Sequence, residues 1–303
     1  MIVVKLDNVE FRLKEYQDFS WIKKYGTIFK VIDQTGSGCI CFGLMNKNKK
    51  YFIKIAGAKT TEAEITPDES IKILKNAAEI YKKLNHQNLV KLIEHYPFEY
   101  YYVAVFEWVD GECLFDHWNF EYYSKNPNFK KPSSRFKDLP NYKKLKTVDT
   151  IFSFFETVAM NNYVAVDFYD GSIMYNFDTD TTTICDIDFY RKKPAVNDMG
   201  ECFFGTKRLK APEEYVYGAC IDEITNIYTL GALIFHFFGQ FSENDIKERY
   251  LRNSFFPCSI DNWNLDKHVF EVALKAVNLE RDNRFKTITE FHLAWNQALK
   301  NHF

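Results

Sequence analysis

Two stretches decide the fold of this chain: Val164-Ala165-Val166-Asp167-Phe168-Tyr169-Asp170-Gly171-Ser172 and Ile184-Cys185-Asp186-Ile187-Asp188-Phe189-Tyr190. Asp167 and Asp188 stand 21 residues apart, and a short hairpin-like segment lies between them. Far upstream, Lys54 follows an apolar run, and Ala211-Pro212-Glu213 lies downstream of both aspartates. This order of one lysine, two aspartates and Ala-Pro-Glu is hard to obtain by chance.

The composition is that of an ordinary globular protein. With 303 residues, 46% of them hydrophobic and 26% charged, the chain is long enough for two lobes that share one interface, and disorder is not favoured. The formal net charge of −2 provides no clustered basic excess for capturing nucleic acid or an anionic membrane. We interpret the local basic segment from Lys130 to Lys146 as a solvated surface. No nucleic-acid or membrane partner is therefore predicted.

The seven cysteines are scattered along the chain and show no zinc-binding spacing. The closest pair, Cys39 and Cys41, alternates on a predicted strand, so both side chains point to the same face. We expect free thiols in a reducing cytosol. The first residues, Met1–Asp7, lack the order of a secretion signal, and no apolar run approaches the ~20 residues that span a bilayer. The predicted location is cytoplasmic.

Residues 27–109 are predicted to form strands around one helix. Three strands make a meander and two more follow the helix: Phe29–Ile32, Cys39–Leu44, Tyr51–Ile55, Leu89–Leu92 and Tyr102–Phe106. The helix begins with Thr66 as N-cap, Pro67 at the first helical position and Glu69 as the partner in a capping box. It ends near Asn85, and its apolar face carries Ile71, Leu74, Ala78 and Tyr81.

From Leu114 onward the pattern changes to helices. Apolar stripes at helical spacing predict helices that include Val148–Ala159, Ile227–Phe238 and Val269–Val277. A short strand pair, Ile173–Tyr175 and Thr183–Cys185, is joined by a polar turn. Residues 119–141 are polar, aromatic and interrupted by prolines, which predicts an irregular insertion.

These residues together resemble the eukaryotic-like protein kinase superfamily, and the resemblance covers Thr27 to Phe285. It implies an α+β, two-lobed fold, with a small antiparallel β-sheet lobe that carries one main helix and a larger, mostly α-helical lobe. Residues 1–303 then form a single kinase-like domain. Its N-lobe spans about residues 20–108, its C-lobe about residues 112–303, and the insertion about residues 119–141.

The resemblance implies ATP and Mg²⁺ as cofactors. Lys54 matches the strand lysine that holds the α and β phosphates. Counting back from Lys54 places Gly38 at the family's third glycine, and the strand that ends at Phe106 resembles the hinge, whose backbone reads the adenine edge. The residues assigned to the nucleotide site are Ile32, Gly38, Ile40, Lys54, Glu107, Val109 and Met174.

Asp167 matches the catalytic aspartate, which orients the acceptor hydroxyl and accepts its proton, and Lys54 is the second catalytic residue. Asp188 matches the aspartate that joins Mg²⁺ to the β and γ phosphates. Ser172 stands where the family has a metal-binding asparagine, so its hydroxyl is the second expected metal ligand. Two nearby carboxylates either compensate for this weaker ligand or serve only in turns: Asp170 and Asp186.

Further matches concern the architecture. Gly205-Thr206 resembles the end of the family's activation segment, and Arg284 matches the arginine that pairs with Glu213. Asn226 replaces the aspartate that ties down the catalytic loop. These matches bear on the fold rather than on activity.

Several positions around the expected nucleotide depart from the family pattern. Asp33 and Thr35 replace the first two glycines of the phosphate loop, and a carboxylate there repels phosphate. Phe52 stands where the family has an alanine, so its ring narrows the adenine pocket.

The expected partner of Lys54 is also missing. Ala77 takes the place of the family's glutamate, and Glu79 lies about 200° further around the helix. Asp188 is one alternative partner for this lysine.

The expected catalytic loop around Asp167 also departs from the family pattern. Ala165-Val166 replaces His-Arg, so control by phosphorylation of the activation segment is not expected. Tyr169 replaces a lysine that places positive charge on the transferred phosphoryl group. Arg191 and Lys192 are candidates to supply that charge.

Three functions remain open. The first is an active phosphotransferase that moves the γ-phosphate of Mg-ATP to a serine or threonine hydroxyl of a protein, and it is favoured because Lys54, Asp167 and Asp188 occur together. The second is a pseudokinase that binds nucleotide or serves as a scaffold, which the departures support. The third is a small-molecule kinase, for which the insertion at residues 119–141 would build a pocket.

Overall fold

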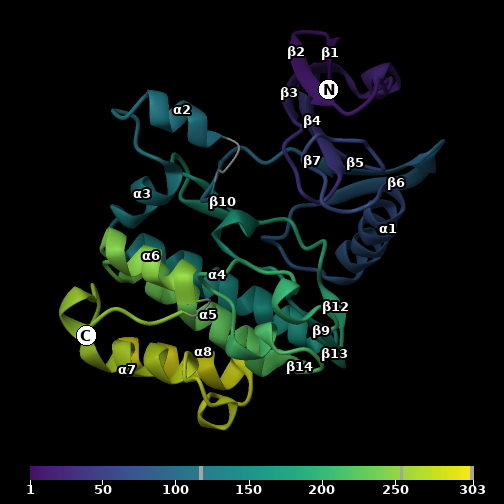
Figure 1. Ribbon diagram of the computed structural model, residues 1–303. Coiled ribbons are helices and arrows are strands. Elements are labelled where there is room, and N and C mark those ends of the chain that lie inside the picture. The colour runs from purple at the N-terminus through teal and green to yellow at the C-terminus, as the bar shows by residue number, and fades with distance from the viewer. Residues whose placement is uncertain (116–118, 253–254, 301–303) are drawn as a thin grey trace. The chain divides into compact units, whose positions relative to one another are not determined.

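The computed structural model describes residues 1–115, 119–252 and 255–300. The chain is α+β with several antiparallel sheets, as predicted. It divides into two compact units, whose elements are labelled in Figure 1. The first unit contains Met1–Asn85, Val90–Asp110 and residues 119–121, and the second contains His86–Leu89, residues 111–115 and residues 122–300. In these residues every helix is too short or too polar to cross a bilayer.

A five-stranded sheet forms the centre of the first unit. Its strand order is β3 (Thr27–Ile32), β4 (Cys39–Asn46), β5 (Lys49–Ala56), β7 (Tyr101–Glu107) and β6 (Leu92–Phe98). The predicted meander is confirmed, because β3 pairs with β4 and β4 pairs with β5, both antiparallel.

The strand predicted over Leu89–Leu92 is wrong. β6 begins only at Leu92, and Leu89 instead forms an isolated bridge with Ile184 in the second unit. Because β6 lies at the sheet edge, it tolerates Pro97, which has no N–H to donate.

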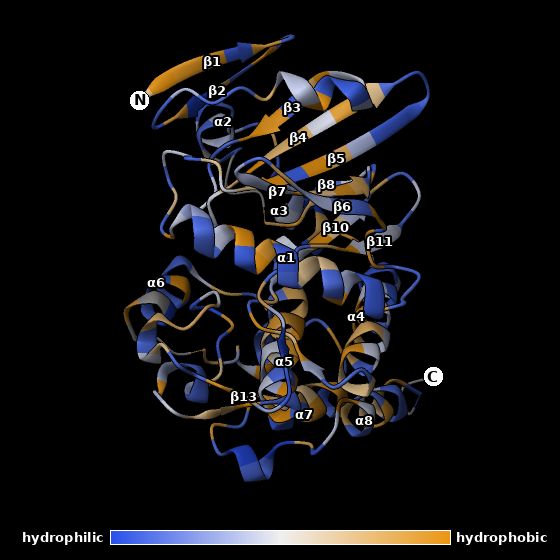
Figure 2. Ribbon diagram, turned by 90° about the vertical axis from the view of Figure 1, so that its right-hand side faces the viewer, coloured by the Kyte–Doolittle hydropathy of each residue, from blue (hydrophilic) through white to orange (hydrophobic). Residues whose placement is uncertain are grey.

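Helix α1 (Pro67–Lys83) packs on β5 and β7, and its predicted start is confirmed. Thr66 Oγ1 accepts a hydrogen bond from the Glu69 N–H at 3.3 Å, and Glu69 Oε2 accepts one from the Thr66 N–H at 2.9 Å. Figure 2 shows hydrophobic residues along β3 and β4 and an alternation of hydrophobic and hydrophilic residues along α1. The buried side of α1 carries Leu74, Ala77, Ala78, Ile80 and Tyr81.

A hairpin that no sequence pattern predicted precedes the sheet. It consists of β1 (Ile2–Leu6) and β2 (Val9–Leu13), joined through Asp7 in a left-handed conformation with φ of 52°. Alternate residues of β2 are buried, and Phe11 packs edge-on against Phe42 of β4 with ring centroids 5.5 Å apart. The first unit therefore has its apolar core between this hairpin and one face of the sheet.

The second unit is mainly helical. Its long helices are α4 (Asn141–Met160), α5 (Glu223–Phe238), α6 (Glu243–Arg252), α7 (Lys267–Ala276) and α8 (Ile288–Lys300). The three predicted apolar stripes lie in α4, α5 and α7, and α5 is buried along almost its whole length. Gly231 lets α5 approach α7 closely, since a Cβ there would lie 2.9 Å from the Ala276 Cβ.

Seven short strands complete this unit. The predicted pair is confirmed as β10 (Ile173–Asn176) and β11 (Thr181–Ile184), and β8 (Glu112–Cys113) joins it on the other side of β10. Two further pairs are β9 (Tyr163–Val164) with β12 (Arg191–Lys192), and β13 (Ala195–Val196) with β14 (Cys220–Ile221). The seven cysteines are thiols that form no disulfide with one another, as predicted.

The insertion predicted to be irregular is partly helical. It contains α2 (Phe120–Lys125) and α3 (Pro132–Lys137), and α3 begins with Pro132 at a first-turn position that needs no N–H donor. Phe136 anchors α3, because its buried ring packs against Tyr175 and Phe237 with centroids 5.1 and 4.8 Å away. Tertiary packing of this one ring explains why so short and polar a segment forms a helix.

The predicted pair between Glu213 and Arg284 is confirmed as a buried bidentate contact. Arg284 Nη1 and Nη2 donate to Glu213 Oε1 and Oε2 at 2.7 and 3.1 Å. Arg281 Nη1 reaches the same Oε1 at 2.5 Å, and the Thr225 hydroxyl of α5 donates to it at 3.0 Å. The pair therefore ties the segment after residue 211 to α5.

Replacing Arg284 by methionine should lower the free energy of unfolding by about 3 kcal/mol, because the buried Glu213 carboxylate loses its main partner. Urea unfolding followed by circular dichroism measures the loss. Lys286→Met is the control, since Lys286 lies at the exposed surface and its replacement should change stability by less than about 0.5 kcal/mol. A loss below about 1 kcal/mol in Arg284→Met would contradict the assigned role.

Candidate functional site

Asp167 follows β9 in a left-handed backbone conformation, with φ of 61°. This conformation is uncommon for residues other than glycine, costs on the order of 1–3 kcal/mol and persists only where the surroundings enforce it. Here Val166 and Phe168 on either side are buried, and the Phe168 ring packs edge-on against Phe155 at 4.8 Å. The loop is therefore held by its apolar neighbours, and Asp167 itself is half-buried.

Asn226 of α5 fixes the residue two positions before Asp167. Its Oδ1 accepts a hydrogen bond from the Ala165 N–H at 2.8 Å, and its Nδ2 donates to the Ala165 carbonyl at 2.6 Å. Asn226 is buried, so both bonds form away from water. An amide provides the donor and the acceptor at once, whereas an ionised aspartate only accepts.

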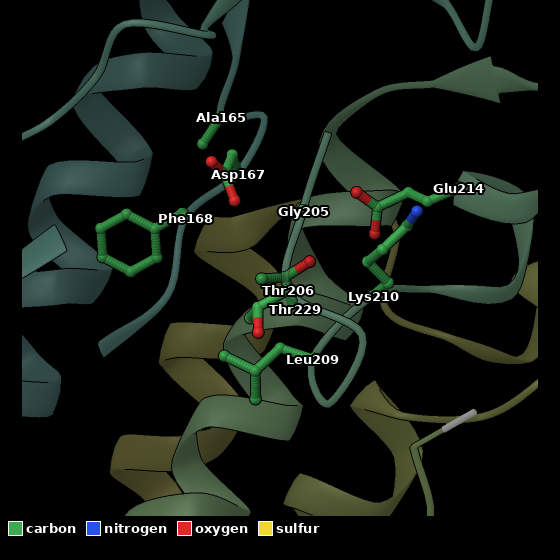
Figure 3. A pocket seen from close by; sticks show the side chains of 9 residues that line it. All are labelled: Ala165, Asp167, Phe168, Gly205, Thr206, Leu209, Lys210, Glu214 and Thr229. Carbon is green, nitrogen blue, oxygen red and sulfur yellow. The ribbon is translucent and has the colours of Figure 1, made fainter. Parts of the chain in front are cut away.

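Asp167 lines a small hollow that is partly open to solvent. Figure 3 shows the Asp167 carboxylate on one side of it and the side chains of Lys210 and Glu214 on the other, while the Phe168 ring points away. The remaining lining residues are Ala165, Gly205, Thr206, Leu209 and Thr229. The amine of Lys210 and the carboxyl groups of Asp167 and Glu214 therefore line the same hollow, which is only partly open to solvent.

The carboxyl groups of this hollow bind protons unusually tightly. Burial, together with the charges of Asp186 and Asp188, raises the pKa of Asp167 to about 8, and the charge of Lys210 acts in the opposite direction. Burial also raises the pKa of Glu214 to about 8, although its carboxylate accepts a hydrogen bond from the Ala211 N–H at 2.7 Å. Shifted pKa values of this kind are typical of functional sites.

Lys210 is a residue that the sequence analysis did not single out. It is buried, its amine donates to the carbonyl oxygens of Phe203 and Glu201 at 2.8 and 3.3 Å, and it lies over the Tyr215 ring. Its stem crosses Gly205, where a Cβ would lie 2.9 Å from the Lys210 Cγ. The signal available in the sequence was the position of this lysine, directly before Ala211-Pro212-Glu213 and shortly after Gly205.

The two expected metal ligands differ in their surroundings. Asp188 is buried, and its charge acts on Asp167 in the same unit. Ser172 is fully buried and its hydroxyl accepts from the Tyr169 N–H at 3.5 Å, so this oxygen fits a metal ion less well than Asp188 does. Over the described ranges no three His, Cys, Asp or Glu side chains converge on a metal site. Mg²⁺ that is shared with phosphate oxygens needs only one or two protein carboxylates.

Asp170 does not compensate for Ser172. Its buried carboxylate is engaged by Arg208 and, at 3.2 Å, by His236, and Arg208 holds the pKa of Asp170 below its usual range against the effect of burial. Asp186 is exposed and adopts φ of 55°, as a turn residue does.

The other expected nucleotide residues lie mostly in the first unit. Ile32 pairs with Cys41, and Cys41 pairs with Lys54, so these three side chains share one face of the sheet. The expectation for Ile40 is wrong, because it lies on the opposite face and packs in the hairpin core. Since side chains alternate along a strand, its neighbour Cys41 lies on the face that carries Lys54.

The phosphate-loop residues are fixed within the first unit. Gly38 has φ of 68°, and a Cβ there would lie 3.3 Å from the side chain of Ser70 in α1. The Asp33 carboxylate accepts a hydrogen bond from the Arg12 N–H at 2.7 Å, so its charge is partly satisfied by the hairpin. This contact weakens the repulsion of phosphate that the sequence predicts.

At the expected hinge, the Glu107 N–H donates to the Lys91 carbonyl at 2.9 Å, and its carboxylate pairs with the Lys91 amine at 2.8 Å. Val109 follows β7 and is partly buried. Met174 lies in the second unit, on β10 opposite Cys113 of β8.

Phe52 lies on the same sheet face as Lys54. Its ring centroid is 6.3 Å from that of Phe106, its cross-strand partner, and 6.5 Å from that of Trp108. Ala77 is buried on α1, while Glu79 is exposed and pairs with Lys82 at 3.3 Å and His95 at 3.7 Å. Glu79 is therefore occupied at the far side of the helix, as predicted.

Of the two cations suggested to replace the missing catalytic-loop lysine, Arg191 is engaged elsewhere. Arg191 pairs with Asp198 at 2.9 Å and donates to the Val196 carbonyl, and Lys192 is exposed on β12. Tyr169, at the lysine position, folds its ring over Gly171, where a Cβ would clash with it.

Asp167→Asn should change the pH dependence of stability. The pKa of Asp167 is about 8 in the folded protein and 3.8 in the unfolded chain, so the native state binds the proton more tightly. Ionisation of this group therefore lowers the free energy of unfolding as pH rises from about 4 to 8, and no further above pH 8. Between pH 5 and pH 9 the variant should gain about 2 kcal/mol relative to the unsubstituted protein, after allowance for solvent screening. Thermal unfolding over this range measures it, with the exposed Asp282→Asn as the control. Parallel pH profiles for all three proteins would contradict the raised pKa.

No protein-family model matches the chain, and a comparison with curated proteins gives no match either. The functional assignment therefore rests on the residues and their geometry.

Proposed function

We propose that the protein is an ATP-dependent phosphotransferase with a two-lobed, protein-kinase-like fold, which transfers the γ-phosphate of Mg-ATP to a serine or threonine hydroxyl of a protein. The observation that supports it best is the setting of Asp167. A carboxylate in an enforced left-handed conformation, within electrostatic range of Asp188 and beside a buried lysine, suits a group that handles a proton during phosphoryl transfer.

The fold assignment draws support from two interactions at positions where the family has them. Asn226 holds the loop before Asp167 from the central helix, and Arg284 pairs with Glu213 in Ala211-Pro212-Glu213. Each joins segments far apart in the sequence, which a chance match of short motifs would not produce.

In the proposed reaction each residue has one task. Lys54 and Asp188 hold the nucleotide, the first through the α and β phosphates and the second through the metal ion. Mg-ATP, when bound, supplies the transferable phosphoryl group and neutralises its developing charge. Asp167 orients the acceptor hydroxyl and takes its proton, and a pKa near neutrality favours both taking and releasing it.

Asp167→Asn should lower phosphate transfer from labelled ATP by about 10²–10⁴-fold, because the amide cannot accept the proton. Asp282→Asn, a fully exposed position, is the matched control and should retain full activity. Label in protein supports the proposed acceptor, whereas label only in small molecules supports a small-molecule kinase. Equal transfer by Asp167→Asn and the control would rule out Asp167 as the base.

One observation favours a pseudokinase instead. Phe52, Phe106 and Trp108 gather their rings on the sheet face that carries Lys54, where the adenine is expected. A nucleotide then competes with aromatic side chains for the same space.

Phe52→Ala separates the two functions. For the phosphotransferase, Mg-ATP at ~100 times its dissociation constant should stabilise the unsubstituted protein by ~2.7 kcal/mol in thermal unfolding, and Phe52→Ala should bind at least as tightly. Tyr51→Phe is the control, since Tyr51 packs in the core on the opposite face. Stabilisation that appears only in Phe52→Ala would favour the pseudokinase.

A further inference from the structure

Three cations of the second unit lie within electrostatic range of one another. Lys137 ends α3, Arg208 lies between Thr206 and Leu209 of the hollow, and Arg249 lies on α6. We call these three residues the basic cluster. Their charges act on one another, because both arginines lower the pKa of Lys137.

The acids around the cluster do not balance it. Asp170 is buried and engaged by Arg208, and His236 beside it is neutral, since burial lowers its pKa to about 4. Asp245 acts on Arg249 but caps its own helix, where it accepts from Ser242 at 2.7 Å. Lys144 of α4 adds a further positive charge near Lys137. Within the described part of the chain the cluster carries excess positive charge.

Its donors are also incompletely used. Arg208 and Arg249 are only 8% and 3% exposed. Among the described residues, Nη1 of Arg208 and Nε of Arg249 are buried and have no hydrogen-bond partner. Lys137 forms no hydrogen bond or ion pair through its amine in this part of the chain. A buried donor of a charged group is costly when it has no hydrogen-bond partner, so an anion that supplies the missing acceptor would be bound favourably.

Aromatic rings shield the guanidinium groups from water. Phe115 lies 4.7 Å from the Arg208 guanidinium carbon, and Phe241 lies 3.6 Å from that of Arg249. Lys137 is only partly buried and gives the cluster its access to solvent. Burial lowers the pKa of Lys137 to about 8, with Asp170 opposing this and Arg208, Arg249 and Lys144 adding to it. A bound anion would reverse that shift.

The basic cluster is connected to the segments around Asp167 in two ways, through the chain near Arg208 and through the ion pair of Arg208 with Asp170. Arg208 belongs to the segment whose Thr206, Leu209 and Lys210 line the Asp167 hollow. Asp170, which holds Arg208, follows Asp167 by three residues. The cluster therefore adjoins the two segments that carry Asp167 and its hollow.

We propose that the basic cluster of Lys137, Arg208 and Arg249 binds an anionic group, a phosphate or a carboxylate, carried by the acceptor protein. The binding site itself rests on the cluster alone, and its assignment to the acceptor rests on the proposed function. The expected acceptor is a serine or threonine with acidic or phosphorylated residues beside it.

Inorganic sulfate tests the site, because its charge is constant between pH 6 and 10. The background is Lys54→Met, which weakens sulfate binding at the proposed nucleotide site. Compared with sodium chloride of equal ionic strength, sulfate at tenfold excess over its dissociation constant should raise the unfolding temperature by about 3 °C. Adding Lys137→Met should remove most of this rise, and the exposed Lys267→Met should leave it intact.

Folding does not confound this comparison. Lys137→Met replaces a partly buried cation that has no ion pair in the described residues, so without sulfate it should be as stable as the background. An equal sulfate effect in the Lys137 and Lys267 variants would overturn the anion site.

A pair of peptides tests the acceptor. A serine flanked by glutamates should be phosphorylated with about tenfold higher kcat/KM than the same peptide flanked by glutamines, and Lys137→Met should bring the ratio close to one. Transfer to both peptides at equal rates would overturn the acceptor assignment and leave the phosphotransferase standing. No transfer to any acceptor, with sulfate binding still dependent on Lys137, would contradict the proposed function and leave the anion site standing.

Discussion

The second unit depends on one buried helix, α5, to which its chemically important segments are fastened. Near its start, Asn226 holds Ala165 and thereby the Asp167 loop, and Thr225 joins the pair of Glu213 and Arg284. Near its end, His236 contacts Asp170. Because the helix is almost entirely buried, these contacts are short, water-excluded and mutually supporting. A shift of α5 would move the Asp167 loop, the segment around Arg208 and the basic cluster together.

Charge is separated along this helix. On the side of Asn226, Asp167 and Glu214 face the hollow and hold protons tightly, with Lys210 as the nearby cation. On the side of His236, the single buried carboxylate of Asp170 keeps its charge among several cations. The low dielectric of these buried surroundings strengthens both the proton binding of Asp167 and Glu214 and the attraction between Asp170 and its cations. In the proposed function the two sides would bind different parts of one substrate, a hydroxyl and an anion.

Local signals predicted much of the fold, and long-range packing decided the rest. The capping box at Thr66 and the apolar stripe of α5 are encoded in neighbouring residues, and the pairing of Glu213 with Arg284 followed from a resemblance. Ile40 was placed on the wrong face because an interval counted in sequence ignores cross-strand register. Helix α3 depends on the packing of Phe136 against two rings that are distant in the sequence, Tyr175 and Phe237. The basic cluster depends on three separate segments, those of Lys137, Arg208 and Arg249. Neither leaves a periodic pattern in the sequence.

The central proposal is that Lys54 holds the phosphates of a nucleotide and Asp188 holds its metal ion, and the dependence of ATP affinity on Mg²⁺ tests it most directly. Calorimetric titration of ATP with and without Mg²⁺ should show binding at least about tenfold tighter with the metal in the unsubstituted protein, and no such gain in Asp188→Asn. Affinity that is independent of Mg²⁺ in the unsubstituted protein, or an unchanged gain in Asp188→Asn, would contradict it.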